Sequence, residues 1–409
     1  MTSDRTVFVW SWCAGASQPV VAGELRALGD AHDFRYGTSY LGRPDATSLG
    51  PELPLGPEWQ QPSPGLALAG CLRDATPDAW GRRVIDARLE VGLASLPETT
   101  YMLASGSNRF GAIDFQPSAR EYVPRTDTAR LPELHAAAIQ IEAGIPLAPV
   151  LAEALIHGTS IGGARPKILV TDDDGVQWIA KLSSTSDTAF SVVNAEAAAL
   201  WLAAKAGIAV PESEVTRSLG RDVLLVRRFD RVGNGLRRHC LSALTLTGLD
   251  EMSGRYATYP MFLDALRELS SKPIEVGADL FARIVFNIAI GNSDDHARNH
   301  AAFWDGTHLT LTPAFDLSPG PRSGETATQA MAISRSGARD SQFTTCLDAA
   351  GEYGLARAQA RDIIDRIVAT ISDNWTEAAD HARLTEQDRR HLWHRQFLNP
   401  YAFYGYSQA

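Results

Sequence analysis

The sequence lacks several features that would assign it to a whole class of proteins. It has only 4 cysteines in 409 residues, and they lie far apart. This excludes the disulfide framework of small secreted domains and the paired spacing of a zinc site, so we expect reduced thiols, most of them buried. No apolar run approaches the roughly 18 residues of a membrane-spanning helix, and the first residues lack the apolar core of a secretory signal. A soluble cytoplasmic protein without a membrane partner is therefore expected.

Basic charge is also scarce. Lys and Arg number 38 against 48 Asp and Glu, which gives a net charge of −10. Affinity for DNA depends largely on basic side chains that neutralise phosphates, so the chain alone should bind DNA poorly. A local basic patch could still help a basic partner to hold DNA. With 44% hydrophobic and 21% charged residues, the composition is typical of globular domains and excludes wholesale disorder.

The order of predicted elements indicates an α+β protein. The first third is rich in turns: we expect a strand at 7–10, a hairpin over 33–41, a loop over 43–65, a helix over 78–91 and a linker near 117–130. The middle predicts two strands, 168–170 and 177–182, joined by the turn Asp172-Asp173-Asp174-Gly175, then a helix over 193–206 and a strand at 223–228. The last part predicts helices over 260–269, 279–290, 355–374 and 386–396. A small sheet with one inserted helix thus precedes a helical half.

The most informative segment follows the apolar helix predicted over 279–290. There the chain reads Gly-Asn-Ser-Asp-Asp-His-Ala-Arg-Asn-His over 291–300, and so many polar groups are costly in a core but reasonable at a cleft. The kinase catalytic loop places an Asn five residues after its catalytic Asp, which is the spacing of Asp294 and Asn299. Asp316 follows at the end of a short strand. One carboxylate that accepts a proton, with an Asn and a second Asp on Mg²⁺, suits phosphoryl transfer.

Two further residues fit the same chemistry. Lys181 closes an apolar strand that follows a glycine-bearing turn, where kinases keep the phosphate-binding lysine, and Glu196 on the next helix is its candidate ion-pair partner. The turn, with Gly162 and Gly163, lacks the Gly-Lys-Ser/Thr ending of a Walker A loop. Each feature alone also fits an ordinary structural role: a strand-edge lysine, a solvated glutamate, a hairpin turn or a helix cap. Their order favours a kinase.

The chain resembles the HipA-like serine/threonine kinases, the toxins of type II toxin–antitoxin systems. The matching segments are Phe34-Arg35-Tyr36, Tyr40-Leu41, Leu53-Pro54-Leu55, the run from Leu72 to Arg83, Arg109 to Ile113, Thr159 to Lys167, Phe229-Asp230-Arg231, Asp294-x-His296-x-x-Asn299 and Phe315-Asp316. The resemblance implies a two-lobed protein-kinase-like fold with an N-terminal α/β subdomain. Residues 1–116 would form that subdomain, 117–233 the N-lobe with the phosphate loop and the ATP lysine, and 234–409 the helical C-lobe.

The resemblance also implies a role for each candidate residue. Asp294 would be the catalytic base, Asn299 and Asp316 the Mg²⁺ ligands, and Lys181, supported by Glu196, the contact to the ATP phosphates. The other nucleotide-binding residues would be Gly162 and Gly163 of the phosphate loop, Arg227 and Phe229 through their backbone at adenine, Asp230 near the ribose, and His296. Ser160 matches the serine that the family autophosphorylates; a phosphate there adds ~−2 charge in the loop that approaches ATP, which would inactivate the enzyme.

The biological role implied by the resemblance is growth arrest. ATP and Mg²⁺ would be the cofactors, and a translation component such as an aminoacyl-tRNA synthetase would be the phosphorylated protein. A helix-turn-helix antitoxin of the HipB type would be the partner, and DNA would be bound mainly through that antitoxin.

Three other functions remain open at this point. A metal-dependent hydrolase could use Asp294, Asp295, His296 and His300, although the segment lacks the glutamate of a His-Glu-x-x-His zinc site. A kinase fold without catalysis could serve as a binding module for an antitoxin or a DNA complex. A small-molecule phosphotransferase would use the same Asp-x4-Asn logic, but the resemblance of the first third favours a protein substrate.

Overall fold

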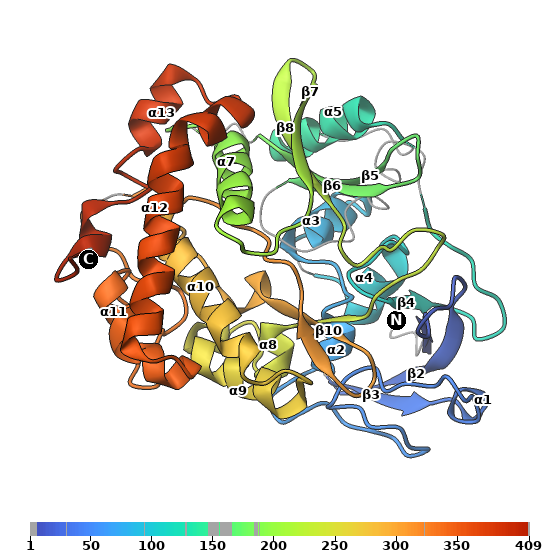
Figure 1. The fold of residues 1–409 in the computed structure, drawn as a ribbon. Helices are drawn as coiled ribbons and strands as arrows, with labels where there is room; N and C mark the ends of the chain where they lie inside the picture. Colours follow the sequence, from blue (N-terminus) through green and yellow to red (C-terminus); the bar gives the residue numbers. More distant parts are fainter. Residues whose placement is uncertain are drawn as a thin grey trace.

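The structure is a computed structural model that describes residues 6–29, 31–93, 95–126, 129–145, 155, 166–183, 187, 189–322 and 324–407. Figure 1 shows two small sheets on the N-terminal side of the molecule, facing a helical half built from the end of the chain. The α+β order predicted from the sequence is confirmed by this arrangement of elements.

The first sheet belongs to the N-terminal subdomain and is antiparallel, with strand order β3-β2-β1-β4. The hairpin expected over 33–41 is wrong, because residues 38–41 form a short helix and β3 pairs with β2. The elements of this part are β1 (Val7–Ser11), β2 (Val20–Leu28), β3 (Ala31–Tyr36), β4 (Ile113–Gln116), α1 (Thr38–Leu41), α2 (Gly70–Arg73), α3 (Ala79–Arg88) and α4 (Glu98–Ala104).

The second sheet is covered by helices on both faces. Its antiparallel order is β5-β6-β8-β7, with β5 (Lys167–Thr171), β6 (Gln177–Leu182), β7 (Ser213–Ser218), β8 (Arg221–Arg227), α5 (Leu131–Glu142) and α7 (Val192–Lys205). Successive side chains of a strand point to opposite faces: on β8, Val223 joins the core that contains α3 and α5, whereas Leu224 joins the core that contains α7. Helix α3 of the N-terminal subdomain therefore covers one face of the sheet that carries Lys181.

The C-terminal half is mainly helical around a short sheet of order β11-β10-β9. Its elements are β9 (Cys240–Ser242), β10 (Ala301–Trp304), β11 (Leu309–Leu311), α8 (Ala243–Leu246), η1 (Ser253–Tyr256), α9 (Tyr259–Leu269), α10 (Glu275–Ala289), η2 (Ala297–Asn299), α11 (Phe343–Ala349), η3 (Ala350–Tyr353), α12 (Arg357–His381), α13 (Glu386–Leu392) and η4 (Pro400–Phe403). The apolar residues of α10 are buried from Leu280 to Ile290. This burial fixes the polar segment that follows α10, and α12 runs from this half up to α7 (Figure 1).

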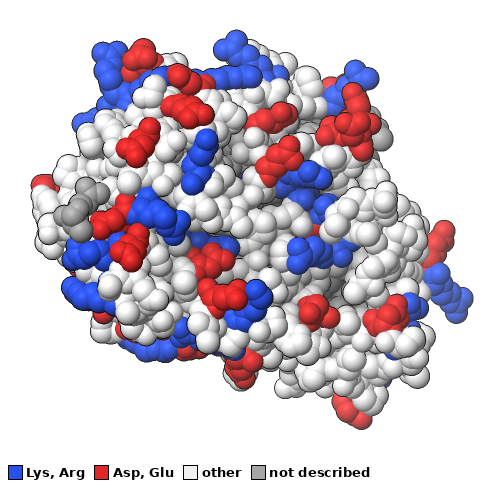
Figure 2. Space-filling view, in the orientation of Figure 1, with Lys and Arg blue, Asp and Glu red and all other residues white. Residues whose placement is uncertain are grey.

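All four cysteines are free and buried, as the sequence predicted. Among the described residues, no helix has both the length and the apolar character needed to cross a bilayer. Acidic and basic side chains are interspersed over the face drawn in Figure 2, so the net negative charge is not gathered in one block on that face.

Candidate active site

Lys181 lies near the end of β6, a strand in which buried and partly exposed residues alternate. Its Nζ donates a hydrogen bond to Oε1 of Glu196 at 2.5 Å and another to Oδ1 of Asp316. Burial alone would lower the pKa of Lys181, but the two carboxylates outweigh burial and raise it. The lysine is therefore held as an ammonium group with 17% of its side chain exposed, which suits a contact to an anion.

Glu196 comes from the second turn of α7 and is 3% exposed. Burial raises the pKa of this carboxyl, and the charge of Lys181 opposes that rise. A buried carboxylate without a partner would be costly, so the ion pair and the position of α7 depend on each other. The structure thus brings together the strand lysine and the helix glutamate that the sequence placed in kinase order.

Asp316 lies five residues beyond the end of β11 and has a positive φ of 58°. Asp is among the few residues other than Gly that adopt this conformation with some frequency. Burial opposes ionisation, but Lys181, Lys167 and, more weakly, His296 lower the pKa of Asp316. The side chain remains 34% exposed. Asp316 is therefore a carboxylate with access to solvent, beside two ammonium groups.

Lys167 is a second lysine at this site, and the sequence reasoning missed its role. It is the first residue of β5 and lies opposite Lys181 in the β5–β6 ladder, so the two side chains share a face of the sheet. Burial lowers the pKa of Lys167 more than the neighbouring Asp316 raises it. The tight turn at 172–175 could have predicted that Lys167 lies beside Lys181. A hairpin closed by this turn pairs Thr171 with Gln177 and, four residues further from the turn, Lys167 with Lys181.

The segment after α10 carries two neighbouring carboxylates, of which Asp295 is buried and Asp294 is exposed. Gly291 begins it with a φ of 70°, and a Cβ at this position would lie 2.8 Å from the carbonyl oxygen of Gln396, so only glycine fits. Asp295 is buried and accepts hydrogen bonds from Tyr259 Oη at 2.6 Å and Asn287 Nδ2 at 2.8 Å. Asp294, by contrast, is exposed and remains accessible to a substrate.

The histidines of this segment do not assemble a zinc site. His300 is 4% exposed, and its Nε2 lies 2.9 Å from Oδ2 of the buried Asp295, so both residues serve the core. His296 is exposed. Over the part of the chain that the structure describes, no group of three or more His, Cys, Asp or Glu side chains could hold a metal ion. The geometry therefore gives the hydrolase alternative no support.

Amide side chains connect the segment at 291–300 to Asp316. Asn292 Nδ2 donates to Asn287 Oδ1 at 2.9 Å and to the carbonyl oxygen of Asp316 at 3.3 Å. Asn299 is 8% exposed, and its Nδ2 donates to the carbonyl oxygen of Asp294 at 3.3 Å. This bond leaves the Oδ1 of Asn299 available as an acceptor. An amide oxygen and a carboxylate such as that of Asp316 are donor types that Mg²⁺ takes, and their role as metal ligands stays a prediction.

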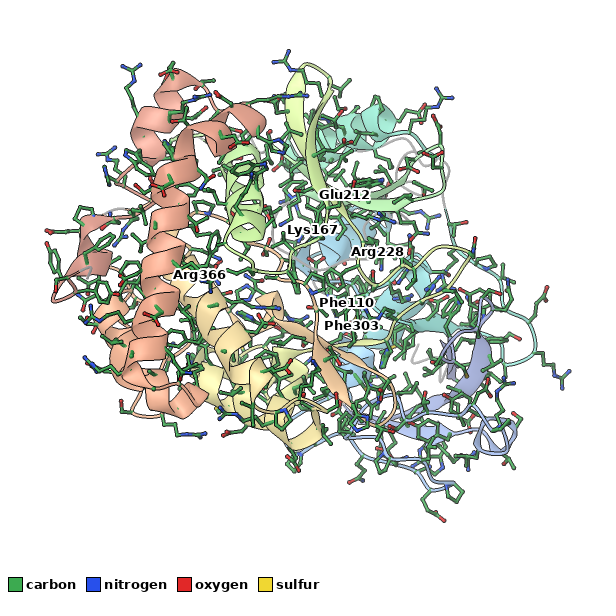
Figure 3. All side chains as sticks on the ribbon, viewed as in Figure 1. Phe110, Lys167, Glu212, Arg228, Phe303 and Arg366 are labelled. Carbon is green, nitrogen blue, oxygen red and sulfur yellow. The ribbon has the colours of Figure 1, made fainter. Side chains whose placement is uncertain are left out.

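An aromatic cluster lies where β8 leaves the sheet. The ring of Phe229 is 6.3 Å from Phe110, 5.8 Å from Phe303 and 5.5 Å from Phe315, and Phe110 and Phe303 lie at the centre of the molecule below Arg228 and Lys167 (Figure 3). Phe229 is only partly buried. The partly exposed rings of the cluster, Phe110, Phe229 and Phe315, suit packing against a flat ring.

The backbone next to this cluster is partly used by the sheet. The amide of Arg227 donates to the carbonyl of Glu212 at 2.8 Å, and the amide of Arg228 donates to the carbonyl of Gln177 at 2.9 Å. The side chain of Arg227 points to solvent, where it pairs with Glu212 at 3.0 Å. If this segment binds a base, the contacts would therefore come from its carbonyl groups and from the amide of Phe229. The roles of Arg227 and Phe229 at the base stay a prediction.

Asp230 is part of a buried network that joins this corner to the N-terminal subdomain. Its Oδ1 accepts from Arg228 Nε at 2.9 Å, and its Oδ2 accepts from Arg228 Nη2 at 2.7 Å, Arg231 Nη1 at 3.0 Å and the amide of Gly111 at 2.8 Å. Burial opposes ionisation, but Arg228 and Arg231 lower the pKa of Asp230 to about 2. The carboxylate is occupied by these donors, and a contact to ribose stays a prediction.

Ser160, Gly162 and Gly163 lie outside the described residues. The residues that the structure does bring together are Lys181, Glu196 and Asp316, with Asp294 and Asn299 on a segment tied to Asp316 by Asn292. Two lysine side chains, a partly exposed carboxylate and an amide oxygen suit a polyphosphate that carries a divalent cation. A second exposed carboxylate nearby can accept a proton.

Comparisons with known proteins relate this chain to two family models. A family model described as HipA-like C-terminal domain matches residues 159–375, and one described as HipA N-terminal domain matches residues 17–116. Over 233 residues the chain is 27% identical to a protein of Sinorhizobium fredii (strain NBRC 101917 / NGR234) named "Putative kinase Y4mE", covering 52% of this chain and 55% of that relative. The chain thus matches about half the length of this curated relative.

A solved structure covers nearly the whole chain. HipA of Shewanella oneidensis MR-1, from the structure of the toxin–antitoxin system HipA, HipB and its operator DNA, superposes with a TM-score of 0.69 at 19% identity, and 94% of each chain is covered. The two-lobed kinase-like α+β fold that the sequence predicted is therefore confirmed.

Proposed function

This chain belongs to the HipA-like family, and from that premise we propose that it transfers the γ-phosphate of ATP, with Mg²⁺, to serine or threonine hydroxyl groups of a protein. The observation that carries the proposal is the meeting of Lys181 with Glu196 and Asp316 beside the segment that holds Asp294 and Asn299. The same residue types perform these roles in protein kinases: lysine on phosphates, Asn and Asp on metal, and Asp at the acceptor hydroxyl.

The phosphate end of the site would work mainly by charge. Lys181 and Lys167 would neutralise phosphate oxygens, and Glu196 keeps Lys181 charged and in place. Asp316 and Asn299 would hold Mg²⁺, which when bound supplies positive charge to the phosphate oxygens. When a nucleotide enters, the ammonium of Lys181 would exchange its contact with Asp316 for a phosphate. Phosphoryl transfer needs little more from the protein than such positioning and charge.

Asp294 would act on the acceptor. Its carboxylate is exposed, and it stands five residues before the Asn proposed to bind metal, as in the kinase catalytic loop. It would accept the hydrogen bond of the serine or threonine hydroxyl and take its proton as the new O–P bond forms, while the bond from the γ-phosphorus to the β-phosphate oxygen breaks and ADP leaves. The aromatic cluster around Phe229 would hold the base at the other end of the nucleotide.

The wider role follows from the family. We propose that the chain is a growth-arresting toxin that phosphorylates a translation component such as an aminoacyl-tRNA synthetase, and that a HipB-type antitoxin binds it and contributes most of the contact to DNA. Support comes from the two family models and from a fold shared with a HipA that was solved with HipB and operator DNA. Autophosphorylation of Ser160 would add about −1.5 to −2 charge to the phosphate loop and so inactivate the enzyme.

The direct test is phosphate transfer by the purified chain. With Mg²⁺ and ATP labelled in the γ-phosphate, the protein should label itself and a protein in a bacterial translation extract. Asp294→Asn should lower the rate about 10²- to 10⁴-fold, the range expected for a lost general base, while Asp373→Asn, an exposed carboxylate on α12, should leave it unchanged. Equal rates for Asp294→Asn and the wild type would remove the proposed role of Asp294. Labelling of a small molecule in place of protein would point to a small-molecule phosphotransferase.

A further inference from the structure

Helix α7 carries Glu196, and both of its ends are bound to the last helices of the chain. In Figure 1, α7 lies beside the upper part of α12, with α13 above it. The alanine-rich sequence of α7 is buried almost throughout, from Val192 to Leu200 and again at Leu202 and Ala203. Small side chains allow a neighbouring helix to approach closely, and α12 packs along α7 with Ile364, Ile367 and Val368 in the shared core.

The first turn of α7 is held by polar contacts. Asn194 is 1% exposed, and its Nδ2 donates to the carbonyl oxygen of Ala382 at 2.8 Å and to Asp222 Oδ2 at 3.0 Å. Ala382 is the residue at the end of α12. The amide of Ser191, which precedes α7, donates to Asp388 Oδ1 of α13 at 3.2 Å. The start of α7, one turn before Glu196, is thus bonded to both α12 and α13.

The last turn of α7 is held by a cation. Arg366 projects from α12 and donates through Nη1 to the carbonyl oxygen of Ala206, at the end of α7, at 2.6 Å. Arg366 is labelled on α12 in Figure 3. The carboxyl end of a helix carries partial negative charge, so an arginine there is favourable. The next residue, Gly207, has a φ of 82° and ends the helix.

We infer that α12 and α13 form a brace that fixes the position of Glu196, with Asn194 and Arg366 as positioning residues that act through the Lys181–Glu196 ion pair. This inference rests on the proposed function, since it concerns the lysine that would bind the phosphates. The ion pair joins a strand of the sheet to α7 at 2.5 Å, and a displacement of α7 by about 1 Å would lengthen it beyond a good hydrogen bond. The C-terminal half of the chain therefore sets the geometry of an N-lobe contact.

A thermodynamic cycle tests whether these residues act through Glu196. In the wild-type background, Asn194→Ala and Arg366→Ala should each lower kcat/KM for ATP about 3- to 10-fold, the loss expected when one or two hydrogen bonds that hold a charged group in place are removed. In a Glu196→Gln background, where the ion pair is absent, the same substitutions should change kcat/KM by less than about 2-fold. Equal losses in the two backgrounds would overturn the inference.

Matched variants separate positioning from general loss of folding. Arg366→Lys keeps a cation at the end of α7 and should restore most of the rate. Asn374→Ala and Arg390→Ala remove side chains that bond only within α12 and α13, and they should leave kcat/KM unchanged. Arg366 is exposed, so its variants keep the test available if Asn194→Ala fails to fold. A loss in either control as large as in Arg366→Ala would contradict the brace.

Hydrogen exchange without nucleotide separates this inference from the proposed function. The amides of α7 around Glu196 should exchange faster in Asn194→Ala and Arg366→Ala than in the wild type or in the two controls. That result would support the brace even in a protein that transfers no phosphate, in which case only the proposed kinase activity would fail. Unchanged exchange along α7 in both variants would overturn the brace whatever the activity.

Discussion

Two clusters of charged side chains lie at opposite ends of the proposed nucleotide site. They contain similar residue types but differ in how exposed and how fully paired these residues are. At the phosphate end, Lys181 is 17% exposed and Asp316 is 34% exposed, so their charges can be offered to a ligand. At the corner next to Phe229, Asp230 is 4% exposed and Arg228 is fully buried, and the carboxylate accepts four hydrogen bonds from protein donors. The proposed phosphate site thus differs from the structural cluster around Asp230 in the exposure and incomplete pairing of its side chains. The presence of charged residues does not distinguish the two.

The largest effect should come from breaking the phosphate end. Asp316→Asn should lower phosphate transfer by at least about 100-fold, because several kcal/mol of metal-dependent charge stabilisation would be lost. Stability should change little, since the side chain is partly exposed. Transfer rates and urea unfolding of the same preparations measure both properties, with Asp373→Asn as the control. Near-normal phosphate transfer by Asp316→Asn would contradict this role and would mean that Asp316, like Asp230, serves only the structure.

Breaking the other cluster should affect stability first. Asp230→Asn leaves Arg228 and Arg231 buried without a carboxylate, which typically costs about 3–5 kcal/mol. The free energy of unfolding should fall by this amount, while the fraction that is folded at low temperature keeps its KM for ATP within a few-fold. A large rise in KM with unchanged stability would instead place Asp230 at the ribose.

Acid should weaken the second cluster in a calculable way. Burial opposes the charge of Asp230, but Arg228 and Arg231 lower its pKa from 3.8 to about 2. A carboxyl whose pKa is depressed by folding contributes stability above its unfolded pKa, and the contribution is lost as the pH falls towards the folded value. Between pH 5 and pH 3 the stability advantage of the wild type over Asp230→Asn should therefore shrink by about 1 kcal/mol. Urea unfolding at the two pH values measures it; a constant difference would contradict the assignment.

The smallest effect should come from the exposed arginine beside this cluster. Arg227 pairs with Glu212 in solvent, where the two side chains are 49% and 64% exposed, and such pairs contribute about 0–1 kcal/mol. Arg227→Ala should change the free energy of unfolding by no more than about 1 kcal/mol. The KM for ATP should stay nearly unchanged, because only the backbone of Arg227 is proposed to lie near the base. A marked rise in KM would show that the side chain reaches the nucleotide.

The sequence predicted those parts of the site that depend on local order. A strand, a helix and a loop follow one another in kinase order, and the structure brings the side chains of Lys181, Glu196 and Asp316 that they carry into contact. The buried helix before Gly291 and the turn at 172–175 are local signals of the same kind. Their roles with nucleotide and metal remain predictions that the experiments above address.

The features that the sequence could not predict depend on contacts between distant segments of the chain. Phe110 and Phe303 contact Phe229 from distant positions before and after it in the sequence, and Arg366 contacts α7 from α12. No local pattern marks such contacts. The wrong hairpin over 33–41 has the same origin, since β2 pairs with β3 in its place. Strand pairing is decided by burial and neighbours across the sheet, which a short alternating run does not specify.

The proposed kinase activity requires that Lys181, Asn299 and Asp316 meet at the phosphates of a nucleotide. Calorimetric titration of the purified chain with ATP, in the presence and absence of Mg²⁺, tests it most directly. We expect Mg²⁺-dependent binding of one ATP per chain by the wild type, and loss of this binding in Asp316→Ala but not in Asp373→Ala. Binding of equal strength by Asp316→Ala and the wild type, or binding that ignores Mg²⁺, would contradict it.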